Sequence, residues 1–422
     1  MKIAVINIDD SLGGASMACI RLAEAINNEE GVEVDILVQK KTLNLTSIKP
    51  IGNGPFWKLK TFIRFVLERL YFFLFEKSKE IRFAYSPAFA GIDITKKVDF
   101  SQYDIIHLHW INFGFLSLKS LHKITRLGKP IVWSMHDMWP FTGGCHYSND
   151  CLNYEKSCGN CSQFLKHPAA NDLSHKHFLK KKLAYNKNAK MHFIGSSKWL
   201  GDLGKNSGLL RTFKVSDIPT VVSSSFRLVD KSTCRQELSL PEDKKLILFV
   251  AMIIADNRKG FSYLSDALQL LSKEKQCLES IELVVIGNAN GIHQDDLPFK
   301  THLLGKITDM EKLNKVYNAS DVFVIPSTQD NLPNTVMEAL STGTPCVGFK
   351  VGGIPEMIDH LTNGYVSDYK STESLASGMK WILNHKAYQL LSENAIKKAK
   401  STYSAKAVSA KYMKVYKDLL EN

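Results

Sequence analysis

Short apolar runs alternate with helical stretches through the first half of the chain. Residues 14–27 and 117–126 read as helices, and the runs around them are the length of strands. Strands that are apolar throughout, alternating with helices, predict a parallel sheet covered on both faces. The predicted strands are residues 2–8, 32–38, 105–110, 131–135 and 191–195.

The alternation stops at residues 218–230 and then begins again. This segment, IPTVVSSSFRLVD, contains one proline and three consecutive serines, and we interpret it as a linker. The sequence therefore predicts an α/β protein of two doubly wound, Rossmann-like domains facing a cleft, with ligands at the carboxyl ends of the strands. The predicted strands of the second half are residues 245–251, 281–286, 302–304, 322–327 and 345–349.

Chain length agrees with this division, because 422 residues are more than a domain with one hydrophobic core usually contains. We place the first domain at residues 1–222 and the second at 223–403. The last stretch, 404–420, is amphipathic and can pack on either domain; we expect residues 404–422 on the first.

Composition is that of a soluble globular protein, with 44% hydrophobic and 23% charged residues. The apolar run 2–8 is short and is closed by Asp9 and Asp10, which favours a buried strand over a signal peptide. Every window of 18 residues contains charge, so we expect no membrane-spanning helix. These features predict a cytoplasmic protein.

The net charge of +12 favours anionic partners. Nucleic acid, an acidic membrane surface and phosphorylated ligands all fit that charge. The sequence contains no RNP pattern, zinc finger or basic heptad region, so we expect no nucleic-acid partner.

Two acids frame a polar loop after the predicted strand 322–327. Asp330 stands at the mouth of the loop, and Glu338 lies one turn inside the helix that follows. Two such carboxylates can grip vicinal hydroxyls, while the backbone amides at the helix N-terminus can hold an anion. A nucleotide-sugar would use all of these groups, although the spacing alone also fits a surface turn before an ordinary helix.

Cations follow the predicted strand 245–251. Arg258 and Lys259 precede a helix that opens at Phe261, where two cations are misplaced unless an anion offsets them. Arginine binds phosphate through two parallel hydrogen bonds and lysine as a point charge, so a diphosphate suits the pair. A solvated basic turn is the alternative. The chain has no D-x-D pair of the kind that holds a sugar diphosphate through a divalent metal.

The first half offers two further candidates at strand ends. Gly13 and Gly14 would let a ligand approach the backbone, although they also suit a tight strand–helix turn and do not form G-x-G-x-x-G. His136 follows the predicted strand 131–135, where it could donate to a ligand hydroxyl or carry a proton, or simply be structural.

Four cysteines fall together in the pattern C-x5-C-x6-C-x2-C. Four thiolates can complete a tetrahedral structural zinc site, whereas free thiols or a redox pair are the alternatives. The predicted ligands are Cys145, Cys151, Cys158 and Cys161.

Residues 56–76 form an amphipathic stretch rich in aromatic residues. Lysines and arginines interrupt it away from its apolar face, which predicts either an interfacial helix on an anionic membrane or a helix packed between domains. The aromatics Phe65 and Phe72, off the main face, favour the membrane. The apolar face consists of Phe56, Leu59, Ile63, Val66, Leu70 and Phe73.

Together these motifs resemble glycosyltransferase family 4, which has the two-domain GT-B architecture. The segment QDNLPNTVMEALSTGTPCVGFKVGGIPEMIDHLTNGY resembles the family's E-x7-E region and its continuation, and ADNRKGFSYLSDAL resembles its phosphate-binding segment. In the first half, GGASMACIRLAEAI, HDMWPFTGGCHYSNDCLNYEKSCGNC and SSKWL resemble a subgroup of bacterial surface-polysaccharide enzymes, including those of colanic-acid, capsule and O-antigen synthesis.

The resemblance implies a retaining transfer from a nucleotide-sugar without a catalytic metal or other cofactor. It assigns Arg258 and Lys259 to the leaving diphosphate, Asp330 to hydroxyls of the donor sugar and Glu338 to the ribose. Gly13 and Gly14 would close over the phosphates, and His136 would touch the donor sugar from the acceptor side. The loop residues implied in donor binding are Asn331, Leu332, Pro333, Asn334 and Thr335.

One departure from the family pattern is Asp330, which stands where the family has glutamate. The shorter carboxylate either tunes the choice of sugar or lowers activity. We therefore predict transfer of a hexose from a UDP- or GDP-sugar to a lipid-linked or oligosaccharide acceptor in surface-polysaccharide synthesis, at the inner face of the cell membrane. The alternatives are a nucleotide-sugar epimerase of the same fold and a non-catalytic nucleotide-sugar-binding subunit.

Overall fold

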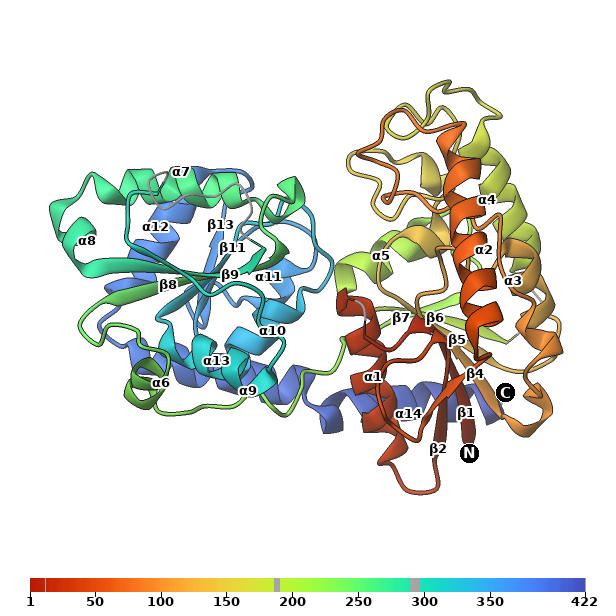
Figure 1. Cartoon of the computed structure of the whole chain (residues 1–422), viewed down its shortest axis with the longest axis horizontal. Helices are drawn as coiled ribbons and strands as arrows, with labels where there is room; N and C mark the ends of the chain where they lie inside the picture. The colour runs from red at the N-terminus through yellow and green to blue at the C-terminus, as the bar shows by residue number, and fades with distance from the viewer. Residues whose placement is uncertain (12, 186–189, 289–296, 422) are drawn as a thin grey trace. The chain divides into compact units, whose positions relative to one another are not determined.

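The computed structural model describes residues 1–11, 13–185, 190–288 and 297–421, which form two compact units. The first unit comprises Met1–Thr220 together with Val408–Asn422, and the second comprises Val221–Ala407. Within each unit, helices cover both faces of a single parallel sheet (Figure 1).

The sheet of the first unit has seven strands in the order β3-β2-β1-β4-β5-β6-β7, all parallel. The order reverses direction at β1, which is the switch point of a doubly wound sheet. The strands are β1 Lys2–Asp9, β2 Glu33–Lys40, β3 Ile48–Pro50, β4 Ile105–Leu108, β5 Ile131–Met135, β6 Met191–Gly195 and β7 Lys214–Asp217.

Three helices of the first unit begin where a polar side chain accepts a backbone N–H of the first turn, as Ser117, Asp172 and Ser197 do for α3, α4 and α5. The helices are α1 Gly13–Asn27, α2 Pro55–Phe73, α3 Leu118–Ile124, α4 Leu173–Ala184 and α5 Lys198–Asn206, together with α14 Ala405–Glu421 from Val408 onward. Short 3-10 turns lie at Ile94–Lys96, Phe100–Gln102, Trp139–Phe141 and Asn153–Glu155.

Helix α14 packs against this sheet, although it is the last element of the chain. Its Tyr412 hydroxyl lies 2.7 Å from Ser134 Oγ on β5. Its Tyr416 hydroxyl lies 2.7 Å from His107 Nδ1 on β4. These buried polar contacts fix the orientation of α14 on the strands.

The second unit repeats the same plan with six parallel strands in the order β10-β9-β8-β11-β12-β13. The strands are β8 Lys245–Ile253, β9 Ile281–Asn288, β10 Thr301–Leu303, β11 Val322–Ile325, β12 Cys346–Phe349 and β13 Gly364–Ser367. The helices are α6 Lys231–Glu237, α7 Phe261–Ser272, α8 Lys275–Ser280, α9 Met310–Ala319, α10 Asn334–Ser341, α11 Ile354–Met357, α12 Thr372–Leu383 and α13 Tyr388–Tyr403, with a 3-10 turn at Asn257–Lys259.

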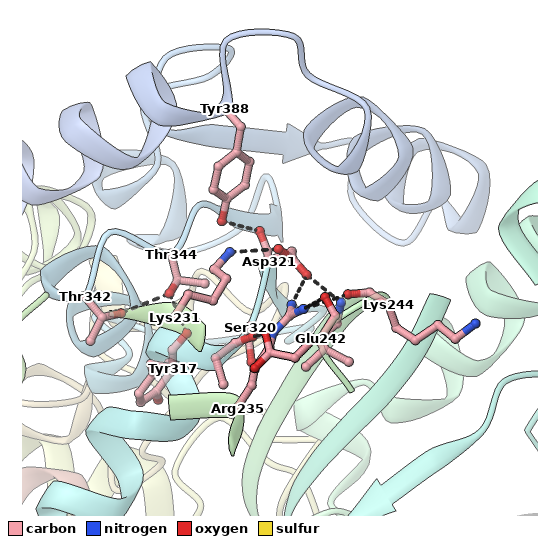
Figure 2. Close-up of polar contacts among 12 residues, drawn as sticks. Lys231, Arg235, Glu242, Lys244, Tyr317, Ser320, Asp321, Thr342, Thr344 and Tyr388 are labelled. Atoms are coloured by element: carbon pink, nitrogen blue, oxygen red, sulfur yellow. Dashed lines mark hydrogen bonds and ion pairs between the residues drawn. The ribbon is translucent and has the colours of Figure 1, made fainter. Parts of the chain in front are cut away.

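A closed network of charges ties α6 and α9 to the amino end of β11 (Figure 2). Asp321 accepts from Arg235 Nη2 at 2.8 Å, from Lys231 Nζ at 2.7 Å and from the Leu246 backbone N–H at 2.7 Å. The other Arg235 nitrogens donate to backbone carbonyl oxygens of Ala319, Pro241, Glu242 and Lys244. Every charge here has a protein partner, which is how a buried ion pair is tolerated.

The predicted α/β class and the doubly wound sheets are confirmed, and the central strands lie within a few residues of their predicted bounds. Sequence reasoning missed β3, β7 and β13. Each is an edge strand of three or four residues that is only partly buried, so none shows as a continuous apolar run. Among the described residues, no helix is long and apolar enough to cross a membrane.

Candidate active site

Three neighbouring strands of the second unit end at one edge of the sheet, and the loops after two of them carry predicted donor-site residues. The turn Asn257–Lys259 follows β8, residues 326–333 follow β11, and residues 350–353 follow β12. Since β8, β11 and β12 are adjacent in the sheet, their carboxyl-end loops meet.

Lys259 and Asp330 form an ion pair across two of these loops. Lys259 Nζ lies 2.6 Å from Asp330 Oδ2, and Arg258 Nη1 lies 3.5 Å from the same oxygen. Burial would raise the pKa of Asp330, but the two cations outweigh it and hold the pKa below its usual value. Asp330 is therefore a carboxylate at neutral pH, able to accept hydrogen bonds from sugar hydroxyls.

Two glycines make this close approach of loops feasible. Gly260 has a φ of +71°, and a Cβ there would lie 1.9 Å from the carbonyl oxygen of Pro326. Gly352 has a φ of +59°, and a Cβ there would lie 1.8 Å from the carbonyl oxygen of Asp330. Sequence reasoning did not single out either glycine, although both stand in the motifs quoted above and each precedes a helix.

The loop from Asn331 to Thr335 leads from Asp330 into α10, which begins at Asn334 with Pro333 at its N-cap. Glu338 lies within α10 and is 6% exposed, and its Oε2 accepts a hydrogen bond of 3.0 Å from the Tyr317 hydroxyl. The two acids of the predicted pair are thus both buried and stand at either end of this loop. Their roles toward a ligand, and those of the loop residues, stay predictions.

In the first unit, His136 directly follows β5 and shares a hydrogen bond of 2.9 Å with His109, between Nε2 and Nδ1. Burial lowers the pKa of His136 to about 4, and burial lowers the pKa of His109 well below its usual value. Both imidazoles are therefore neutral near pH 7. The sequence did not single out His109, because it lies in an apolar run that reads as a strand, where a histidine is usually a buried structural residue.

Gly13 and Gly14 lie at the start of α1, beyond the carboxyl end of β1. Gly13 has a φ of +78°, a conformation that favours glycine, and Gly14 is exposed. The structure thus places both at the carboxyl edge of the first sheet beside its switch point, where ligands of doubly wound sheets generally bind. Their contact with phosphates stays a prediction.

Both halves of the chain match glycosyltransferase families. Residues 12–178 match the family described as Glycosyltransferase Family 4, and residues 230–402 match the family described as Glycosyl transferases group 1. The chain belongs to glycosyltransferase family 4. The predicted family and the predicted enzyme class, a glycosyltransferase, are confirmed.

Relatives of this family 4 glycosyltransferase include an uncharacterized glycosyltransferase of Methanocaldococcus jannaschii, 25% identical over 100% of this chain and 99% of that protein. WcaC of Escherichia coli, named for colanic acid biosynthesis, is 22% identical over 75% of this chain and 76% of its own.

Among solved structures, sucrose-phosphate synthase of Thermosynechococcus elongatus superposes with a TM-score of 0.69 at 19% identity, covering 100% of this chain and 99% of that one. Anabaena HepE in complex with UDP gives 0.65 at 14% identity, covering 99% of this chain and 100% of that one. At these identities the likeness shows the fold, which is GT-B as predicted.

The structure contradicts the predicted zinc site at the cysteine motif of this glycosyltransferase. Cys145, Cys151, Cys158 and Cys161 all line one cavity of about 340 Å³. However, in the described part of the chain no three His, Cys, Asp or Glu side chains gather closely enough to hold a metal ion. Burial raises the pKa of Cys158 to about 12 and that of Cys161 to about 11, so both line the cavity as neutral thiols when no metal is bound.

Proposed function

We propose that the second unit binds the donor, a UDP- or GDP-hexose, and that the first unit binds a lipid-linked or oligosaccharide acceptor of surface-polysaccharide synthesis. The ion pair of Lys259 with Asp330 at the carboxyl edge of β8 and β11 is the observation that carries the proposal. In this pair, a cation that can bind phosphate is hydrogen-bonded to a carboxylate that can bind sugar hydroxyls. Anabaena HepE, which shares the fold, has been solved with UDP-glucose, and this supports a uridine donor.

The proposed reaction retains the configuration of the sugar. The bond between the anomeric carbon and the diphosphate oxygen breaks, and an acceptor hydroxyl forms a new bond on the same face. The hydroxyl proton passes to the departing diphosphate, so atoms and charge balance. Negative charge grows on that diphosphate, and Lys259 and Arg258 would stabilise it because they are already held in place by Asp330 and the backbone oxygen of Gln329.

No catalytic metal is needed in this scheme, because the two cations neutralise the leaving group. Asp330 would orient the donor sugar through its hydroxyls, and Glu338 would hold the ribose. The side chains of Lys259 and Arg258 are 25% and 36% exposed, so a diphosphate can reach them from solvent.

The test is transfer from UDP-glucose or GDP-mannose to a membrane extract of acceptor lipids by the Lys259→Ala enzyme. Loss of one preorganised charge from the developing oxyanion should lower turnover about 100- to 1,000-fold. Lys275→Ala, which removes an 87% exposed lysine of the same unit, is the matched control and should leave turnover unchanged. Equal turnover of the two variants would refute the phosphate role of Lys259.

Asp330 in place of glutamate favours one alternative, a subunit that binds a nucleotide-sugar without transferring it. Thermal-shift screening against UDP-, GDP- and ADP-sugars identifies the donor, since a bound ligand stabilises the fold by mass action. Stabilisation by a donor with no transfer to any acceptor would support the binding subunit. Conversion of the donor without an acceptor would instead support an epimerase.

A further inference from the structure

Helix α2 reverses the usual amphipathic arrangement of a helix on a sheet. It exposes large apolar side chains and buries charged ones, so that Glu68 is 0% exposed while Phe56 and Phe62 are 79% and 63% exposed. A helix that covers a sheet normally does the opposite, with its apolar stripe toward the core. The exposed stripe consists of Phe56, Leu59, Phe62, Ile63, Leu67 and Leu70.

Buried polar contacts prevent α2 from turning this stripe inward. The Glu68 carboxylate accepts backbone N–H bonds from Ala88, Phe89 and Ala90 at 2.8–3.0 Å. Arg69 donates to the carbonyl oxygen of Tyr85 at 3.1 Å. Rotating the helix to bury the stripe would leave these buried polar groups unpaired, and an unpaired buried charge is strongly destabilising.

The charges around the stripe are positive. Lys58 and Lys60 are exposed on either side of its first turns, and Lys77 and Lys79 follow its carboxyl end. From Pro55 to Phe83 the acidic residues are Glu68 and Glu76, both buried, and Glu80. Lysines of this kind can lie with their stems along apolar surface and their ammonium groups in a layer of phosphates.

We propose that α2 is the surface through which this enzyme docks on a lipid bilayer containing anionic headgroups. The helix is 19 residues long but carries charge along its length and cannot span a bilayer, so it lies in the plane of the interface. Its stripe enters the acyl boundary, and its lysines meet the phosphates. A second copy of the chain fits less well, because Lys58 and Lys60 of two copies would repel across a symmetric contact.

The test is flotation of the full chain with vesicles of phosphatidylcholine, with and without phosphatidylglycerol. The wild type should float with the anionic vesicles and release as salt is raised. Lys58→Glu with Lys60→Glu should weaken binding roughly 30-fold or more, at about 1 kcal/mol for each lysine removed from the surface. Lys397→Glu with Lys400→Glu, on α13, makes the same change in net charge and should bind as the wild type does.

Phe62→Ser with Leu70→Ser tests the apolar part, and Leu183→Ser with Leu390→Ser is its control at exposed leucines elsewhere. The first pair should abolish flotation and the second should not, while both keep the wild-type melting temperature and donor binding. Equal flotation of the two pairs, or of the two lysine pairs, would overturn the proposal. A lipid-free dimer that Phe62→Ser with Leu70→Ser dissociates would assign the stripe to a second copy instead.

Discussion

Two buried aspartates flank β11, and each carboxylate meets one arginine and one lysine. Asp321, at the amino end, accepts from Arg235 at 2.8 Å and from Lys231 at 2.7 Å. Asp330, beyond the carboxyl end, lies 2.6 Å from Lys259 and is itself 8% exposed. The residue types are the same at both ends, so composition alone does not separate structure from function.

The arginines beside the two aspartates differ in their exposure to solvent and in their partners. The Arg235 side chain is 5% exposed and its nitrogens are bound to four backbone carbonyl oxygens besides Asp321 (Figure 2), whereas the side chains of Arg258 and Lys259 reach solvent. A ligand can therefore compete for both cations beside Asp330, whereas the arginine beside Asp321 is closed to it. Ligands of open α/β sheets bind at the carboxyl ends of strands, which is where Asp330 lies and Asp321 does not.

The largest effect should come from breaking the closed network. Arg235→Ala leaves the Asp321 carboxylate buried with a single cation, and we expect a loss of about 3–5 kcal/mol in the free energy of unfolding. Chemical denaturation measures it. Lys231→Ala removes the half-exposed partner of the same carboxylate and should cost under about 1 kcal/mol. Equal losses would mean that the network is not organised around Arg235.

Asp330→Asn should act on activity far more than on stability. A neutral amide accepts hydrogen bonds from sugar hydroxyls less strongly, and a charged hydrogen bond contributes about 1.5–3 kcal/mol, so turnover should fall about 10- to 150-fold. Steady-state transfer measures this, and the melting temperature serves as the control. Asp321→Asn should reverse the pattern, with lost stability. If Asp330→Asn lost as much stability as Asp321→Asn, the two ends of β11 would not differ in function.

The sequence anticipated one side of this comparison better than the other. Lys259 and Asp330 were expected together because each follows an apolar strand and such ends share an edge. Asp321 and Arg235 carry no motif, because only the fold brings Arg235 on α6 next to Asp321 and the carbonyl oxygen of Ala319.

Similar reasons explain the other outcomes. The apolar face of α2 was visible in its periodicity, but periodicity does not say which face is buried, and here Glu68 and Arg69 are inside. The cysteine spacing suggested a metal site because spacing along the chain does not report distances across a cavity.

Gly260→Ala should have a smaller effect, confined to the site. The left-handed φ of +71° costs a residue with a side chain about 1–2 kcal/mol, and the new Cβ would push against the Pro326 oxygen. The displaced loop would draw Lys259 away from Asp330. We expect weaker donor binding by calorimetry, with Gly305→Ala as the control, since Gly305 has a φ of +65° but no neighbour within 4 Å of its would-be Cβ. Equal donor affinity in the two variants would show that close approach at Gly260 is unimportant.

The smallest effect should be the pH dependence of stability at Asp330, because burial and the two cations act in opposite directions on its pKa. The net effect lowers the folded-state pKa below the unfolded value. The ionised group therefore contributes stability above the unfolded pKa, and that contribution is lost as pH falls through the folded one. Urea unfolding between pH 7 and pH 3 should show the wild type losing more stability than Asp330→Asn at the acidic end. Other carboxyls titrate in both proteins and cancel in the difference. Parallel pH profiles would mean that Lys259 and Arg258 do not hold Asp330 in its ionised form.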